Sequence, residues 1–333
     1  MLSLVSACAP VIQRAGLDLT AFEKIVWPGA PEKPRIQYLW SLHRLGNAAD
    51  GEGAGFKMFF AGSEMEELQA MSALGRPQGI YADERRYYIA DPGAVRVTVI
   101  DRVTLDVMHI LYAGADRLEY PISVVSDNAG NIYVTDPELG KVIVYDSRGD
   151  FRFYFDGDIG RPAGLAMDNK RGLVYVADSL GHAVHIYGTD GKRKRSIGKR
   201  GEGDGEFNYP GHLVVDRDGT LYVSDFLNFR IQIFSPEGRF IAKFGKVGDS
   251  YDALDKPKGI GVDNEGHIYV VDGAKDMVKI FDRNGRLLLF FGETGHDYGQ
   301  FYLPTGMYIE NNVIYVADTI NRRIQALRFL GGQ

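Results

Sequence analysis

Six aspartates recur along the chain, each at the end of a short apolar run of the form Tyr-Val-x-Asp or Tyr-Ile-x-Asp. They are Asp91, Asp136, Asp178, Asp225, Asp272 and Asp318, spaced 42 to 47 residues apart. Five positions after them stand, in order, Arg96, Lys141, Ala183, Arg230, Met277 and Arg323. Most of these later positions are basic, so the spacing provides for charge pairs or for a ring of charge that selects a ligand.

The carboxylates have two interpretations. In the structural one, an aspartate that ends a strand accepts backbone N–H bonds in a turn and pairs with the base. In the functional one, the charges surround a channel mouth and contact a ligand. Repeats three and five carry Ala183 and Met277 in place of a base. We therefore expect Asp178 and Asp272 to be the carboxylates least neutralised by a partner.

Two further polar residues stand where the other repeats have glycine. A Pro-x-Gly sequence opens each repeat, but the second repeat has Ser123 and the fourth has His212 at the glycine position. A histidine there can act as a base, a ligand or a polar filler. The candidate binding residues are Ser123, His212, Asp225, Arg230, Asp318 and Arg323.

Short strands must position these residues. Each repeat has four apolar runs separated by turns, and in the fifth repeat they are residues 259–263, 267–272, 277–282 and 287–291. The turns carry Asn, Asp and Gly, which suit a reversing backbone. The second run is apolar throughout, so its sheet must be covered on both faces. Four-stranded sheets packed between neighbours of their own kind are the blades of a β-propeller, and the period agrees with one.

The two ends of the chain predict how the ring closes. The sixth repeat stops after its third run, residues 323–327, and lacks an outer strand. A lone strand-like run at residues 35–42 has no blade of its own. If it supplies the missing strand, no long sheet edge is left exposed. We predict an all-β fold: a six-bladed β-propeller of four-stranded antiparallel blades over residues 34–333, closed by an N-terminal strand.

The repeats resemble those of the NHL-repeat family. The pattern Pro-x-Gly-Ile-x-Val-Asp, Ile-Tyr-Val-x-Asp, Asn-x-Arg-Ile-Gln-x-Phe and Phe-Gly is carried closely by residues 210–245 and 304–327. The resemblance covers residues 77–328, although repeats one to three depart from it, repeat three with Gly181 and Ala183. It implies a propeller fold, but NHL-type propellers include scaffolds, ligand binders and enzymes, so it does not choose among these functions.

The N-terminal residues resemble the end of a bacterial lipoprotein signal. Small and apolar residues lead into Cys8, the single cysteine, as in a lipobox, where the cysteine is lipidated. The stretch has no Lys or Arg and is shorter than a full secretory signal, so an incidental cysteine is the alternative. We predict that residues 1–33 are a signal remnant and a proline-rich tether. The protein would then lie in the bacterial cell envelope, lipid-anchored and facing the periplasm; a cytoplasmic protein is the alternative.

An insertion at residues 45–76 interrupts the pattern before the first repeat. It begins with a Gly-rich stretch and continues with a predicted helix, in which Ser63 is the N-cap and Glu66 completes a capping box. Such a short helix needs a surface on which to dock. It is expected on the face that carries the six aspartates, either as a plug or as a lid or partner-binding element.

Charge and residue spacing restrict the partners. The net charge is -6, and the basic run at residues 192–200 is expected on one outer strand without interleaved aromatics. We therefore predict no nucleic-acid partner and expect a monomer. No histidine or cysteine pair has a metal-binding spacing, so we predict no metal, no cofactor and no catalytic residue. Metal ligands contributed by different blades would escape this test.

Two functions of different classes remain. The first is a non-enzymatic binding or scaffold protein for a protein or small ligand on the insertion-bearing face, attached to the membrane through its lipid anchor. The alternative is a metal-dependent propeller hydrolase or lyase that uses the central channel. The sequence favours a protein that is not an enzyme but does not name its ligand.

Overall fold

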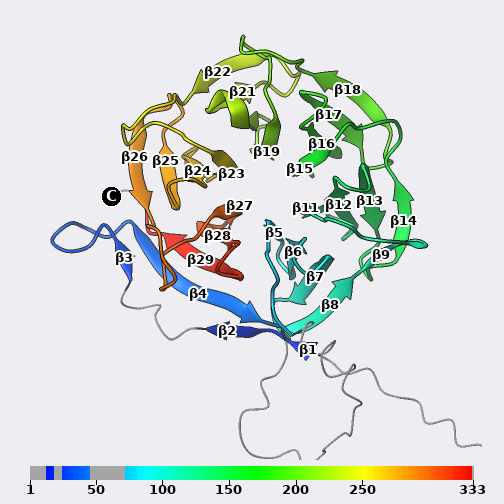
Figure 1. The fold of residues 1–333 in the computed structure, drawn as a ribbon, viewed down its shortest axis with the longest axis horizontal. Coiled ribbons are helices and arrows are strands. Elements are labelled where there is room, and N and C mark those ends of the chain that lie inside the picture. Colours follow the sequence, from blue (N-terminus) through cyan, green and yellow to red (C-terminus); the bar gives the residue numbers. More distant parts are fainter. Residues whose placement is uncertain (1–12, 19–24, 46–71, 332–333) are drawn as a thin grey trace, which may run out of the picture.

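The computed structural model describes residues 13–18, 25–45 and 72–331. In these residues the chain is an all-β, six-bladed propeller of antiparallel sheets arranged around a central axis (Figure 1). The predicted fold class is confirmed. The inner strands, which line the axis, are β5 (Gly79–Ala82), β11 (Ser123–Ser126), β15 (Pro162–Asp168), β19 (Pro210–Val215), β23 (Pro257–Val262) and β27 (Pro304–Glu310).

The second strand of each blade is the most deeply packed part of the fold. In β24 (Ile268–Asp272), for example, all five residues are buried, as an unbroken apolar run between two neighbouring sheets requires. The other second strands are β6 (Arg86–Asp91), β12 (Ile132–Asp136), β16 (Leu173–Asp178), β20 (Leu221–Asp225) and β28 (Val313–Asp318).

The third and fourth strands complete each blade toward the rim. The third strands are β7 (Arg96–Asp101), β13 (Lys141–Tyr145), β17 (Ala183–Gly188), β21 (Arg230–Phe234), β25 (Met277–Phe281) and β29 (Arg323–Phe329). Five outer strands follow directly in sequence: β8 (Asp106–Ile110), β14 (Phe151–Tyr154), β18 (Arg193–Ile197), β22 (Phe240–Phe244) and β26 (Leu287–Phe291). A small hairpin, β9 (Tyr112–Ala113) with β10 (Asp116–Arg117), and a single 3-10 turn, η1 (Phe226–Asn228), lie in the connections.

An N-terminal strand closes the ring, as predicted. Strand β4 (Ile36–Arg44) pairs antiparallel with β29, with Leu42 opposite Ile324 and Trp40 opposite Ala326. It is therefore the outer strand of blade six, and Figure 1 shows it beside the C-terminal blade. The first and last parts of the sequence thus share one sheet, which leaves no open seam in the ring.

Part of the predicted tether belongs to the folded body. Strand β1 (Gln13–Arg14) pairs with β8 of blade one, whereas β2 (Gly16–Asp18) and β3 (Val26–Trp27) both pair with β4. The sequence shows no sustained period here because each strand has only two or three residues. These segments extend two blades beyond four strands.

The two faces of the ring differ in what they carry. On one face lie the turns between second and third strands and the links from one blade to the next. We call it the insertion face, because the insertion leaves it at Leu45 and returns at Ser72. The Leu45 backbone N–H donates to the Ser72 carbonyl at 2.7 Å, so the two ends of the insertion meet. The predicted helix lies outside the described residues.

Glycine recurs near the start of the inner strands because these strands converge at the axis. A Cβ atom on Gly164 would lie 2.6 Å from the Gly211 carbonyl oxygen, and one on Gly79 would lie 2.6 Å from the Ile122 carbonyl oxygen. A side chain fits there only where the next blade leaves room. Ser123 and His212 occupy two such places.

Candidate functional site

The six aspartates organise the links between blades. The Asp318 carboxylate accepts the Tyr302 backbone N–H at 2.8 Å, and Asp91 accepts those of Gly75 and Arg76 at 2.7 and 2.8 Å. In each case the donors lie just before the inner strand of the same blade. The aspartate at the end of the second strand therefore fixes the chain as it enters the blade.

Two of the predicted binding pairs are buried ion pairs. Arg230 Nε donates to Asp225 at 2.8 Å, and Arg323 Nε donates to Asp318 at 2.6 Å. The Arg323 side chain is 3% exposed and that of Asp318 is 0% exposed. Arg323 also donates to the backbone carbonyls of His296, Asp297 and Gln300. This geometry gives both pairs a structural role, and their role in binding stays a prediction.

The expectation for Asp178 and Asp272 was wrong, because both have a partner. His185 Nε2 lies 3.3 Å from Asp178, and Lys279 Nζ lies 2.8 Å from Asp272. Each partner stands seven positions after its aspartate, on the third strand. Burial alone would raise the pKa of Asp178, but the hydrogen bonds from His185 and backbone N–H groups lower it overall. The prediction considered only the fifth residue after each aspartate, whereas these partners are the seventh.

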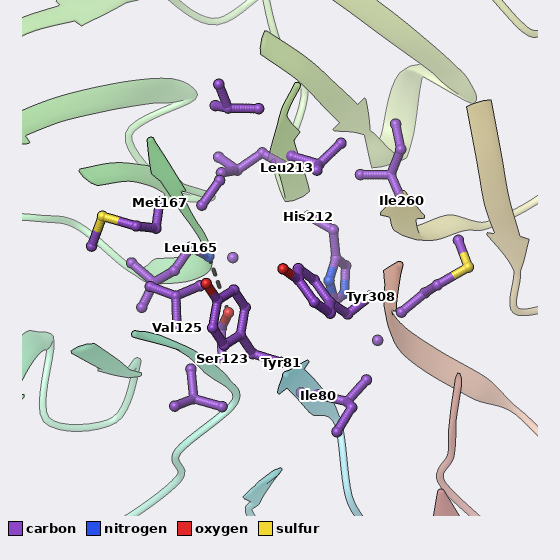
Figure 2. Close-up of a pocket in the computed structure, with 18 of the residues that line it drawn as sticks. Ile80, Tyr81, Ser123, Val125, Leu165, Met167, His212, Leu213, Ile260 and Tyr308 are labelled. Atoms are coloured by element: carbon purple, nitrogen blue, oxygen red, sulfur yellow. Dashed lines mark hydrogen bonds between the residues drawn. The ribbon is translucent and has the colours of Figure 1, made fainter. Parts of the chain in front are cut away.

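The inner strands enclose a cavity on the propeller axis. Its volume is about 170 Å³, and its wall comes from the inner strands of all six blades. Most of the lining side chains are apolar, and Figure 2 shows Ile80, Val125, Leu165, Leu213 and Ile260 around it, although polar backbone and side-chain groups make up slightly more than half of the exposed wall. A cavity lined by apolar side chains with a few polar groups is typical of a small-molecule site.

Ser123 and His212, both predicted from sequence, line this cavity. Ser123 Oγ accepts the backbone N–H of Leu165 at 3.0 Å, so it joins the inner strands of blades two and three. The His212 ring points into the channel, and no hydrogen bond joins it to the lining residues drawn in Figure 2. Burial, assisted by the charge of Lys258, lowers the pKa of His212 to about 4. At neutral pH this imidazole is uncharged and can both donate and accept.

Two tyrosines that the sequence analysis overlooked make the cavity asymmetric. Tyr81 and Tyr308 point into the channel from neighbouring blades, with ring centroids 4.5 Å apart (Figure 2). Burial is the main cause that raises the pKa of Tyr81 to about 12. Comparison of the repeats would have identified them, because the equivalent positions are small or branched: Val125, Ala166, Val214 and Gly261.

The face opposite the insertion face carries a second, more polar cavity. It measures about 550 Å³, and it shares Tyr81, Asn169 and Tyr308 with the wall of the axial cavity. Its carboxylates are engaged: Asp83 accepts the Tyr88 hydroxyl at 2.7 Å, and Glu310 pairs with Arg102 at 2.6 Å. The polar groups here therefore bond mainly to one another.

The basic run at residues 192–200 includes the outer strand β18 of blade three. In the basic run, Arg193 lies over the Tyr187 ring at 5.4 Å, and the Arg195 guanidinium donates to the carbonyls of Pro236 and Glu237. Cys8 lies outside the described residues. In the described part of the chain, no helix is long and apolar enough to cross a membrane. Nor do those residues contain three His, Cys, Asp or Glu side chains placed to hold a metal.

The fold defines the class, a six-bladed β-propeller, and comparison with known proteins agrees. A family described as 6-bladed beta-propeller matches residues 158–243. A search of curated proteins gives no significant match.

Several solved structures are similar to the chain. An auxiliary nutrient binding protein from Bacteroides thetaiotaomicron is 14% identical, covers 78% of this chain and 71% of its own, and has a TM-score of 0.60. A protein of unknown function from the same organism is 17% identical, with coverage of 77% and 70% and a TM-score of 0.59. Virginiamycin B lyase from Staphylococcus aureus is 15% identical, with coverage of 77% and 96% and a TM-score of 0.57. At such identities the likeness establishes the fold alone.

Proposed function

We propose that the protein is a non-enzymatic binding propeller that holds a small ligand in its axial cavity. The observation that carries the proposal is His212, an uncharged imidazole that faces a cavity lined mostly by apolar side chains and bonds to none of the lining residues drawn around it. The residue is half-buried, and a partly desolvated polar group without a hydrogen bond carries a cost. A ligand that bonds to the imidazole would remove that cost.

The size of the cavity supports a small ligand. About 170 Å³ is close to the roughly 150 Å³ of an engineered apolar cavity that takes up benzene. A ligand with one ring-sized apolar part therefore fits. The cavity extends from the level of Ser123 and His212, toward the insertion face, to Asn169 and Tyr308, where it adjoins the cavity of the opposite face. Entry from the insertion face, which the sequence favours, is part of the proposal.

The alternative, a metal-dependent hydrolase or lyase in the channel, stays a prediction. The similarity to virginiamycin B lyase is a likeness of fold and carries no reaction to this chain. Nothing in the described cavity favours the alternative over a binding protein.

We also propose that the protein is an NHL-type, lipid-anchored monomer of the bacterial cell envelope. Cys8 and the residues before it support the anchor. Since β1 begins at Gln13, a lipid on Cys8 would keep the rim of blade one within about 20 Å of the membrane, at roughly 3.5 Å per residue. We expect the protein from its native host to partition into the detergent phase, and we expect Cys8→Ala to lose this partitioning. Equal partitioning of the two proteins would contradict the proposed anchor.

The binding proposal is tested by blocking the cavity. Val214 lines the cavity and is not fully buried, so Val214→Phe places a ring in the space. Wild type and variant are equilibrated with a small-molecule extract of the host and examined by native mass spectrometry. We expect a bound small molecule on the wild type and none on Val214→Phe.

Asn264→Phe is the matched control, because Asn264 lies on an exposed turn of blade five and is not part of the cavity wall. This control should retain the ligand, and thermal unfolding should show that both variants are folded. If Val214→Phe retains the ligand as well as the wild type does, or the wild type retains none, the axial cavity is not the binding site.

A further inference from the structure

One position on the insertion face alternates in chemistry around the ring. It is the residue just before the proline that opens each repeat, where the link enters the inner strand near the channel mouth. Blades one, three and five have a base, and blades two, four and six have an apolar or aromatic residue. In chain order these mouth residues are Arg76, Tyr120, Arg161, Tyr209, Lys256 and Leu303.

The apolar members of this ring are exposed. Tyr120 and Tyr209 are each 37% exposed, and Leu303 is 43% exposed. Turns on the same face add Leu180 and Leu227, at 50% and 40%. Leu227 is adjacent to the ring, because its backbone N–H donates to the carbonyl of Asn208, the residue before Tyr209. The mouth therefore offers apolar surface between basic residues, of which Arg161 is paired with Glu138 at 3.0 Å.

Lys258 stands two residues after the mouth residue Lys256, on the inner strand of blade five. It precedes Gly259 on β23 and is half-buried. Its side chain runs over Gly273, where an added Cβ would lie 3.0 Å from the lysine Cδ. A larger residue at Gly273 would therefore displace Lys258.

Lys258 has no carboxylate partner in the described part of the chain, and the nearby acids are engaged. Asp272 is paired with Lys279, and Asp276 accepts the Thr294 hydroxyl at 2.8 Å and the Leu303 N–H at 2.7 Å. Burial, and then the charge of Lys256, lower the pKa of Lys258, whereas the charge of Asp276 raises it in part. A half-buried ammonium beside another cation gains stability when an anion pairs with it.

We propose that this mouth binds the anionic group of an amphipathic ligand, a carboxylate or a phosphate, with Lys258 as its ion-pair partner. The apolar part of the ligand extends past His212 into the axial cavity. This inference rests on the proposed function and specifies the chemical class of the ligand. Lys258 is the second residue of β23 and His212 is the third residue of β19, and these two inner strands pack against each other. The lysine therefore stands at the same end of the channel as the imidazole.

The test uses four probes that share one ring. Phenylacetate and phenyl phosphate are anions, 2-phenylethanol is neutral and 2-phenylethylammonium is a cation. Their binding to the full chain is measured by isothermal titration calorimetry at low salt, where charge effects are least screened. We expect at least one anion to bind about tenfold or more tightly than the alcohol, and the cation to bind most weakly. The two anions separate a carboxylate from a phosphate ligand.

Two lysine variants locate the charge. Lys258→Met keeps the apolar stem and should remove the preference for the anion while leaving 2-phenylethanol binding within about twofold. Lys275→Met is the matched control, because Lys275 is an exposed lysine of the same blade and face. It should bind every probe as the wild type does.

Each other outcome overturns a distinct claim. If the alcohol binds as tightly as the anions, or if Lys275→Met loses as much anion affinity as Lys258→Met, the anion site is wrong and the binding propeller stands. If no probe of any charge binds, the cavity does not accept a ring-sized ligand, and the proposed function fails with the inference.

Discussion

At the scale of single residues, one carboxylate per blade is held by a changing set of partners. In blades four and six an arginine and a glutamine approach the aspartate together: Gln232 and Gln325 donate to it at 3.1 and 3.0 Å. In blades three and five His185 and Lys279 take the glutamine position. The carboxylate is constant because it accepts the backbone of the link, whereas its further hydrogen bonds come from donors that differ between blades.

Arg323→Met should destabilise the fold without altering the ligand site. It leaves Asp318 buried without its ion-pair partner, and removal of one member of such a pair costs about 3 kcal/mol or more. Urea unfolding measures the loss, and calorimetry with phenylacetate measures binding to the folded variant. A variant with wild-type stability and lost phenylacetate binding would show instead that Arg323 belongs to the binding site.

His212 should make stability depend on pH. Its pKa is lowered from 6.5 to about 4 in the folded state, so the unfolded chain takes up the proton first as the pH falls. Stability is therefore full above pH 6.5 and is lost as the pH drops toward 4. Between pH 7.5 and 4.5 the wild type should lose about 2 kcal/mol more than His212→Gln, allowing for partial solvent access. Equal losses by urea unfolding would contradict the burial of an uncharged imidazole.

At the scale of elements, the inner strands form the axial cavity and β4 closes the ring. Glycine near the start of an inner strand lets neighbouring strands approach at the axis, and the two exceptions, Ser123 and His212, supply the polar groups of the cavity. Strand β4 lies between β29 and the short strand β2. Blade six is thus held together by segments from both ends of the chain.

Ser41→Pro should open the ring. Ser41 is fully buried in β4 and pairs with Gln325 on β29 and with Asp18 on β2. Proline removes a backbone donor and cannot sit in the middle of a sheet, so we expect a loss of about 3 kcal/mol or more. Urea unfolding checks this, with Ser41→Ala as the control for the side chain. If both variants lose the same stability, closure through the β4 backbone is not the cause.

The fold was predictable from the sequence because its signals are repeated. Each blade restates the same turns and apolar runs, and the unpaired run at residues 35–42 identified the closing strand. The short strands β1, β2 and β3 were not predictable, since two or three residues carry no period. Their pairing depends on sheet edges that exist only in the folded ring.

The candidate site was predictable only in part. Ser123 and His212 stood out because they break the Pro-x-Gly pattern, and both line the cavity. Tyr81 and Tyr308 break no motif residue, and only the size of their side chains distinguishes them from the equivalent positions of the other repeats. Lys279 was overlooked because it approaches Asp272 from a position two residues beyond the expected one. Such pairing depends on which way a strand turns its side chains.

At the scale of the whole molecule, the two ends of the axis differ. Basic and exposed apolar residues surround the mouth on the insertion face, whereas the cavity on the opposite face is lined by the acids Asp83, Glu84, Asp127 and Glu310 together with Arg85 and Arg86. With the proposed anion site, the insertion face is therefore the more favourable side for an anionic ligand to approach. The pairing of β4 with β29 closes the ring, so the walls of the cavity are in place before a ligand binds.

The most direct test of the account is a crystal structure of the protein soaked with the anionic probe, phenylacetate or phenyl phosphate, that binds more tightly. The account predicts electron density for the ring in the axial cavity against His212, with the anionic group directed toward Lys258. A probe bound only elsewhere, or an axial cavity that holds water alone at saturating probe, would contradict the claim that this propeller is a binding protein whose ligand lies on its axis.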